Sequence, residues 1–139
     1  MGPSRRIILL VIFITSITAS CYSGKEPVPD CDIQSGPCVK RLANAKVTFD
    51  LSPKPVQPMK ELQFTVNAEN LSSYPERVMV NLSMPGMEMG LNQIVLKRAG
   101  DGTYPGKGLI VKCPKGGRLW KAVVWIPEFG EIEYLFRVE

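Results

Sequence analysis

The chain of 139 residues contains no histidine. Histidine is the commonest general base, a frequent ligand of zinc and copper(II), and a member of the usual catalytic triads. The remaining residues also form no recognisable set of nucleophile, base and orienting group. We therefore expect that the protein is not an enzyme and that any bound metal is held by other ligands.

Dense positive charge is missing as well. The formal net charge is +4, from 17 basic and 13 acidic residues. Two of the basic residues, Arg5 and Arg6, stand near the N-terminus, and the rest of the chain has no cluster of Lys and Arg. Nucleic acid is therefore not an expected partner.

The apolar run at residues 7–14 is far shorter than the roughly 20 residues that a membrane-spanning helix needs. It follows Arg5 and Arg6 and precedes the mostly small or polar residues 15–20. A basic patch, a short apolar core and a small-residue exit are typical of a secretory signal peptide. We predict that residues 1–20 are this signal. The match to the general secretory route is better than the partial match to a twin-arginine signal.

Residues 18–21, Thr-Ala-Ser-Cys, resemble a lipobox, in which Cys21 is acylated and becomes the first residue of the mature protein. The resemblance implies a lipoprotein held firmly in the cell envelope by its acyl chains. Thr18 stands where Leu is usual, so an ordinary signal with a plain Cys21 is the alternative. Tyr22 stands where Asp commonly retains lipoproteins in the inner membrane, which favours the periplasmic face of the outer membrane in a Gram-negative cell.

Residues 21–44 are rich in Gly and Pro and poor in apolar side chains, which predicts a flexible tether after the lipidated cysteine. Cys31 and Cys38 are close enough in sequence to close a small loop in an oxidising compartment. With Cys21 lipidated, three of the four cysteines remain, so at least one is unpaired within a monomer. A Cys31–Cys38 bridge that leaves Cys113 free is the favoured pairing, and pairing of Cys113 with either of them stays open.

Residues 45–139 alternate between apolar and polar side chains at the period of a β-strand. Residues 62–68 are the clearest case, and no segment shows a convincing helical period. The apolar members of the other six expected strands are Val47, Phe49 and Leu51; Val78, Val80 and Leu82; Ile94 and Leu96; Leu109, Val111 and Cys113; Trp120, Ala122, Val124 and Ile126; and Ile132, Tyr134, Phe136 and Val138. About seven short strands separated by turns predict an all-β, immunoglobulin-like antiparallel sandwich.

Three of the six methionines, Met84, Met87 and Met89, fall within one short segment. Thioether sulfur is a soft ligand that selects copper(I), and Pro85 and Gly86 bend the chain so that several sulfurs can face one point. The alternative is packing, because methionine fills irregular gaps and Met84 is in phase with the buried side of the preceding strand. A site made only of thioethers is weak unless a thiolate or an aromatic residue completes it.

Residues 84–90, 102–108 and 116–120 together resemble the YtkA-like domain family. The family pattern is a strand that ends in a Met-Pro-Gly-Met loop, a Gly-x-Tyr-x-Gly hairpin, and a Gly-x-x-x-Trp start to the next strand. The chain is also similar to the extracytoplasmic domain of FixH proteins, which are linked to copper delivery for respiratory oxidases. The resemblance implies an exported immunoglobulin-like sandwich, often encoded beside metal transport or efflux genes and mostly without a proven activity. Many members carry histidine near the methionine loop, and its absence here leaves copper(I), held by Met84, Met87 and Met89, as the metal that the residues allow.

Cys113 has two alternative roles. As a buried thiol it is an inert, small apolar residue, whereas as an exposed thiolate it is a copper(I) ligand or a disulfide-exchange partner. The choice depends on whether its segment meets the methionine loop. We expect a membrane-anchored binding or accessory module that serves another envelope protein in metal transport or in assembly of a respiratory complex. The alternative is a copper(I) metallochaperone that uses the methionine loop, with Cys113 as a further ligand.

Overall fold

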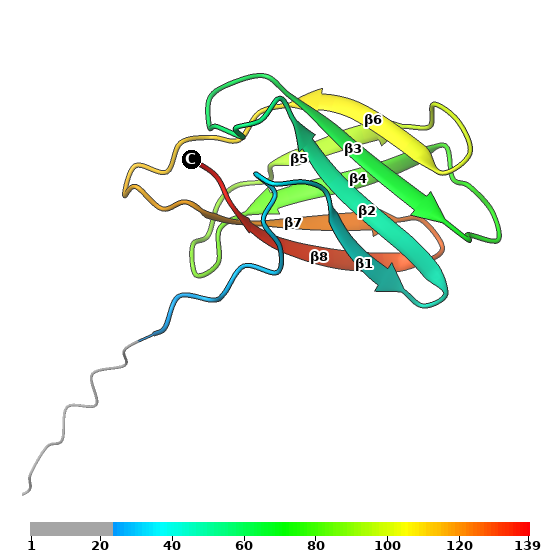
Figure 1. Cartoon of the computed structure of the whole chain (residues 1–139), viewed down its shortest axis with the longest axis horizontal. Coiled ribbons are helices and arrows are strands. Elements are labelled where there is room, and N and C mark those ends of the chain that lie inside the picture. The colour runs from blue at the N-terminus through cyan, green and yellow to red at the C-terminus, as the bar shows by residue number, and fades with distance from the viewer. Residues whose placement is uncertain (1–23) are drawn as a thin grey trace, which may run out of the picture.

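The computed structural model describes residues 24–139, so the predicted signal peptide and Cys21 lie outside the described residues. The described chain has eight strands and no helix, and therefore none that could span a membrane (Figure 1). The strands are β1 (Cys38–Leu42), β2 (Ala45–Ser52), β3 (Leu62–Glu69), β4 (Arg77–Ser83), β5 (Gln93–Lys97), β6 (Thr103–Gly108), β7 (Leu119–Ile126) and β8 (Gly130–Arg137).

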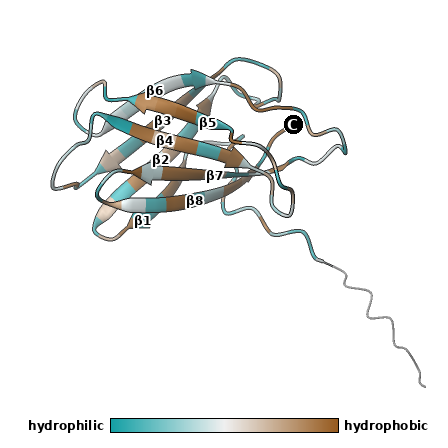
Figure 2. Cartoon of the chain, turned by 180° about the vertical axis from the view of Figure 1, so that it is seen from behind, coloured by the Kyte–Doolittle hydropathy of each residue, from teal (hydrophilic) through white to brown (hydrophobic). Residues whose placement is uncertain are grey.

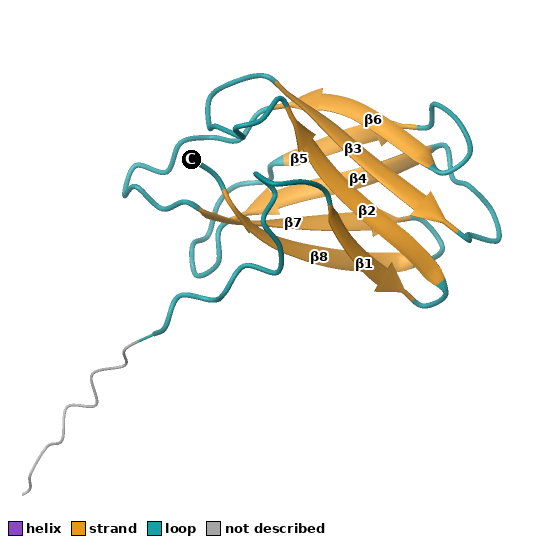
Figure 3. Ribbon diagram, in the orientation of Figure 1, coloured by secondary structure: helices purple, strands orange, loops and turns teal. Residues whose placement is uncertain are grey.

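The strands form two four-stranded antiparallel sheets that pack face to face (Figure 3). The strand order is β1-β2-β3-β6 in the first sheet and β5-β4-β7-β8 in the second. The chain therefore crosses between the sheets after β3, β5 and β6, as it does in Greek-key sandwiches. The predicted immunoglobulin-like antiparallel β-sandwich is confirmed, with β1 as an additional strand at the edge of the first sheet.

The alternating sequence pattern produces the core because successive side chains of a strand point to opposite faces. In β2 and β3 every second residue is buried, and the register pairs Phe49 with Val66 and Leu51 with Phe64. Figure 2 shows the resulting concentration of hydrophobic residues in the strands. The buried faces of the two sheets meet in one continuous apolar cluster.

An aromatic group at the centre of this cluster joins the two sheets. The Phe49 ring of β2 stacks on Tyr134 of β8, with ring centroids 5.4 Å apart, and also contacts Phe136 at 5.8 Å and Phe64 at 6.3 Å. The Tyr134 hydroxyl donates a 2.7 Å hydrogen bond to the Val47 carbonyl in the opposite sheet. Burial raises the pKa of Tyr134 far above its usual value, so this hydroxyl stays protonated and remains a donor.

The predicted tether is wrong for its later part. Residues 38–42 form β1, which pairs with β2 along its length, and Ile33 is completely buried. Asp30 binds β8 through both its backbone and its side chain: its N–H donates to the Leu135 carbonyl at 2.7 Å, and its carboxylate accepts from the Leu135 N–H at 2.9 Å. Few apolar residues are needed here because edge pairing and these polar contacts hold the segment. The folded domain therefore begins before residue 45.

The predicted strand with Leu109, Val111 and Cys113 on one face is also wrong, because residues 109–118 form a loop and β6 covers residues 103–108. Along β6 only Tyr104 is buried. A Cβ at Gly106 would lie 2.5 Å from Leu96 Cδ2, and one at Gly108 would lie 2.6 Å from Ile94 Cδ1. Glycine at these two positions thus lets β6 pack closely against β5 of the other sheet. Because glycine has no side chain, β6 lacks the alternation of apolar and polar residues from which a strand is predicted.

Two buried tyrosines offer a matched test of the bond between the sheets. Replacement of Tyr134 by Phe removes the hydrogen bond from the buried hydroxyl to the Val47 carbonyl and leaves the ring in place. The free energy of unfolding should therefore fall by about 1–2 kcal/mol. Urea unfolding should show a lower midpoint at an unchanged slope.

The control for this test is Tyr104→Phe. The Tyr104 hydroxyl is buried but has no hydrogen-bond partner among residues 24–139, so its removal should be neutral or stabilising. Equal losses of stability in the two variants would show that the Tyr134–Val47 bond contributes nothing specific.

Candidate functional site

The predicted metal ligands gather at one end of the sandwich, which we call the methionine end. It is formed by loops 53–61, 84–92 and 109–118, together with the N-terminal segment 24–29 and the C-terminus (Figure 1). The neighbouring strands β4 and β7 explain this arrangement. Ser83 pairs with Lys121, so the chain that leaves β4 and the chain that enters β7 lie side by side beyond the sheet.

A tight turn places Met84 and Met87 next to each other. The Met87 N–H donates to the Met84 carbonyl at 3.1 Å, and the two residues form an isolated antiparallel bridge. Pro85 occupies the second position of the turn, and Gly86 occupies the third with a φ of 75°. Proline followed by a residue of positive φ is the signature of a type II turn. The Met-Pro-Gly-Met sequence therefore brings two thioether side chains together.

A second turn presents Cys113. The Gly116 N–H donates to the Cys113 carbonyl at 3.0 Å, with Pro114 at the second position and Gly116 at a φ of 76°. Proline and glycine are the residues that β-turns favour at these two positions. The Cys113 side chain is a free thiol and is 5% exposed.

The two turns meet at Gly117. A Cβ at this position would lie 2.5 Å from the Met84 methyl carbon and 3.4 Å from the Cys113 sulfur. Both side chains therefore pack against the same face of Gly117, and only a residue without a side chain leaves them this space. The segment that carries Cys113 does meet the methionine loop.

Met84, Met87 and Cys113 line one cavity of about 220 Å³. Its wall is completed by Pro85, Gly86, Lys115, Gly117 and Leu119, and by Glu26 and Pro27 of the N-terminal segment. A thiol and two thioethers are soft donors, and this donor set suits copper(I). Met84 is 7% exposed and belongs to the core, so it packs as well as lining the cavity.

Met89, the third methionine of the predicted set, is separated from the other two. It is partly buried and packs against the hydrophobic core, but it does not line the cavity. The sequence pattern treated the three methionines alike, whereas the turn at residues 84–87 selects two of them. In residues 24–139 no group of three or more His, Cys, Asp and Glu is placed to hold a metal.

Cys31 and Cys38 are joined by a disulfide, with their Cα atoms 5.7 Å apart. Cys38 is the first residue of β1 and is buried. The bond thus fastens the N-terminal segment to the edge of the first sheet and leaves Cys113 free, while the alternative pairings of Cys113 are not formed.

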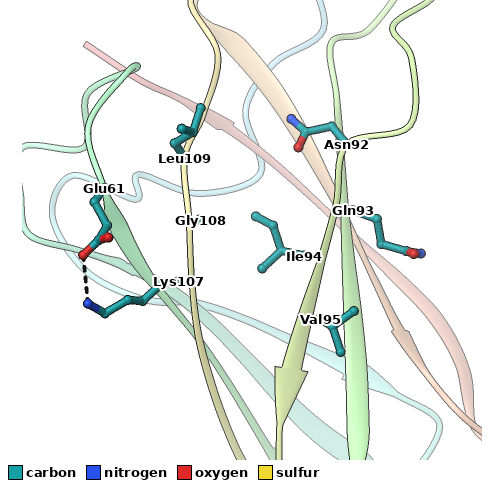
Figure 4. A pocket seen from close by; sticks show the side chains of 8 residues that line it. All are labelled: Glu61, Asn92, Gln93, Ile94, Val95, Lys107, Gly108 and Leu109. Atoms are coloured by element: carbon teal, nitrogen blue, oxygen red, sulfur yellow. Dashed lines mark hydrogen bonds and ion pairs between the residues drawn. The ribbon is translucent and has the colours of Figure 1, made fainter.

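A larger cavity of about 500 Å³ lies between the edge strands β5 and β6, and only Gly106 and Gly108 could have indicated it in the sequence. In Figure 4, Ile94 extends from β5 toward β6, and the Lys107–Glu61 ion pair of 2.9 Å closes one side. Apart from this pair, its polar lining is limited to Asn92 and Gln93, and it includes no sulfur ligand. Its lining suggests no catalytic or metal chemistry.

Comparison with known proteins found no matching family model, no matching curated protein and no matching solved structure. The function of the methionine end must therefore be inferred from the chemistry and placement of its residues.

Substitution of Gly117 tests the contact between the two turns. Gly117→Ala should displace the Met84 methyl group while the fold survives, because the clashing atom is the end of a flexible side chain. In a methyl NMR spectrum of the methionines, the Met84 resonance should shift and the Met79 resonance, from the middle of β4, should not.

Gly90→Ala is the matched control, since a Cβ at Gly90 meets nothing within 4 Å. It should leave the Met84 resonance in place. A Met84 resonance that is unchanged in Gly117→Ala would contradict the packing of this methyl group against Gly117.

Proposed function

We propose that this protein is an envelope-anchored binding module that holds copper(I) at the methionine end through Cys113, Met84 and Met87. The observation that carries the proposal is the meeting of the Cys113 thiol and two thioethers at one cavity, from two turns that are separate in sequence. The thiol supplies the stronger ligand that a site made only of methionine lacks.

The chemistry of these side chains favours copper(I) over harder cations. Cys113 would bind a metal as the thiolate, which is a stronger soft donor than a thioether. Met84 and Met87 remain uncharged at every pH and supply soft donor atoms without a protonation step.

The predicted location agrees with this role. A signal peptide and a lipidated Cys21 would place the domain in the cell envelope, and a disulfide such as Cys31–Cys38 persists in oxidising compartments outside the cytoplasm. The resemblance to the YtkA-like and FixH proteins supports service to metal transport or to the assembly of a respiratory complex. We propose that the module carries or presents copper(I) to another envelope protein, on the periplasmic face and in the outer membrane of a Gram-negative cell.

A second candidate is an accessory module that contacts an envelope partner without metal. The observation that favours it is the packing of Met84, which is buried in the core as an apolar residue would be. In this case the sulfurs fill space, and leucine could replace them without loss of function.

Anaerobic titration of copper(I) against a chromophoric competitor separates the two candidates. Wild type should bind a single copper(I) ion, and both Cys113→Ser and the double variant Met84→Leu/Met87→Leu should bind it more weakly. Loss of an outer-shell residue typically lowers metal affinity by about 10- to 100-fold, and loss of a direct ligand should cost at least as much.

The matched controls are Met89→Leu and Met79→Leu, which replace methionines outside the cavity and should retain wild-type affinity. Leucine preserves apolar volume, so urea unfolding should show all the methionine variants to be folded. Equal binding by every variant, or no binding by wild type, would rule out the copper(I) site and leave the metal-free module.

A further inference from the structure

Four of the seven large exposed apolar side chains of residues 24–139 lie at the methionine end, and the other three, Val39, Val95 and Trp125, lie on strands. Val28 and Leu91 are each 82% exposed, Met59 is 64% exposed and Leu109 is 44% exposed, and all four lie on its loops or on the N-terminal segment. The opposite end of the sandwich is formed by loops 43–44, 70–76, 98–102 and 127–129, and within the described chain these loops carry no large exposed apolar side chain. The loops of the methionine end therefore expose large apolar side chains to water, whereas the described loops of the opposite end do not.

The two ends also differ in charge. The methionine end carries six basic side chains, Lys25, Lys54, Lys60, Lys112, Lys115 and Arg118, and four acidic ones, Glu26, Glu61, Glu88 and Glu139. Its loop 109–118 holds three of the cations, Lys112, Lys115 and Arg118, all exposed, and no acidic residue. These cations are dispersed in sequence, and none of them belongs to an ion pair within residues 24–139. The loops of the opposite end carry three acidic residues and one basic residue, which are Glu76, Asp101, Glu128 and Arg98.

The N-terminus of the described chain also lies at the methionine end. Glu26 and Pro27 line the cavity beside Met84 and Cys113, and Glu26 pairs with Arg137 at 3.0 Å. Cys21 precedes Glu26 by five positions, so the predicted lipid is within about 18 Å of the cavity wall even if the chain between them is fully extended. An anchor on this cysteine holds the methionine end, and not the acidic end, near the membrane.

We propose that the methionine end docks on the surface of an anionic lipid bilayer. Leu91, Met59 and Leu109 enter the interfacial region, and the cations of loop 109–118 contact the lipid phosphates. Apolar burial combined with attraction to anionic lipid is the general basis of interfacial membrane binding. Docking in this orientation goes beyond copper binding and does not require it. It would turn the cavity toward the membrane, so that the partner within reach would be an integral membrane protein.

Hydrogen exchange of the full-length, lipid-anchored and metal-free protein tests this docking. Exchange is compared on vesicles of phosphatidylcholine alone and on vesicles of equimolar phosphatidylcholine and phosphatidylglycerol. Loops 53–61, 84–92 and 109–118 should be protected on the anionic vesicles, and loops 70–76, 98–102 and 127–129 should exchange equally on both. Because the anchor holds the protein on both kinds of vesicle, the difference reports the docking of the domain.

A charge variant separates docking from tethering. Each basic side chain near an anionic surface favours binding by about fivefold, so the triple variant Lys112→Gln/Lys115→Gln/Arg118→Gln should reduce the protection by up to about 100-fold. The matched control Arg77→Gln/Lys97→Gln/Arg98→Gln removes the same charge from the region of the opposite end and should keep the protection.

Three results would overturn the proposal: no protection, equal protection of both ends, or equal protection in the two charge variants. Cys113→Ser should dock as wild type does. Failure of the copper titration therefore leaves docking standing, and failure of docking leaves copper binding standing.

Discussion

Contact between the two sheets through Phe49 and Tyr134 is the constraint on which the methionine end depends. Met84 follows β4 of the second sheet, whereas Cys113 lies on the loop that crosses from β6 of the first sheet to β7 of the second. The register of β4 with β7 in the second sheet brings the Met84 turn beside Gly117, and the separation between the stacked sheets fixes where the Cys113 loop leaves β6. The aromatic stack and the Tyr134–Val47 hydrogen bond set that separation from the centre of the core.

Strands that bury one face were predictable from the sequence, and strands held mainly by backbone contacts were not. The segments that contain Phe64, Val80, Val124 and Tyr134 alternate clearly because each places every second side chain in the core. β1 and β6 lie at the two edges of the first sheet, where pairing with a single neighbour suffices. Their Cys, Lys, Gly and Pro residues therefore showed no alternation that a sequence pattern could detect.

The candidate site was predictable in its parts but not in its assembly. Proline and glycine between Met84 and Met87 already indicated a turn, because this pair of residues favours one backbone conformation. The inclusion of Cys113 and the separation of Met89 depend on the register between β4 and β7, which joins residues about 40 positions apart in sequence. Local pattern carries no information about such a register, so the sequence left the role of Cys113 open.

The Cys31–Cys38 disulfide also determines how the domain bears mechanical load. Tension applied at the N-terminus meets first the Glu26–Arg137 ion pair and the Asp30–Leu135 hydrogen bonds, and beyond them it passes from Cys31 to Cys38 through the sulfur atoms into β1. Residues 32–37, including the buried Ile33, lie outside this path and remain unstretched. A pull from a membrane therefore acts on the hydrogen bonds between β1 and β2, and not on the seam where Ile33 packs into the core.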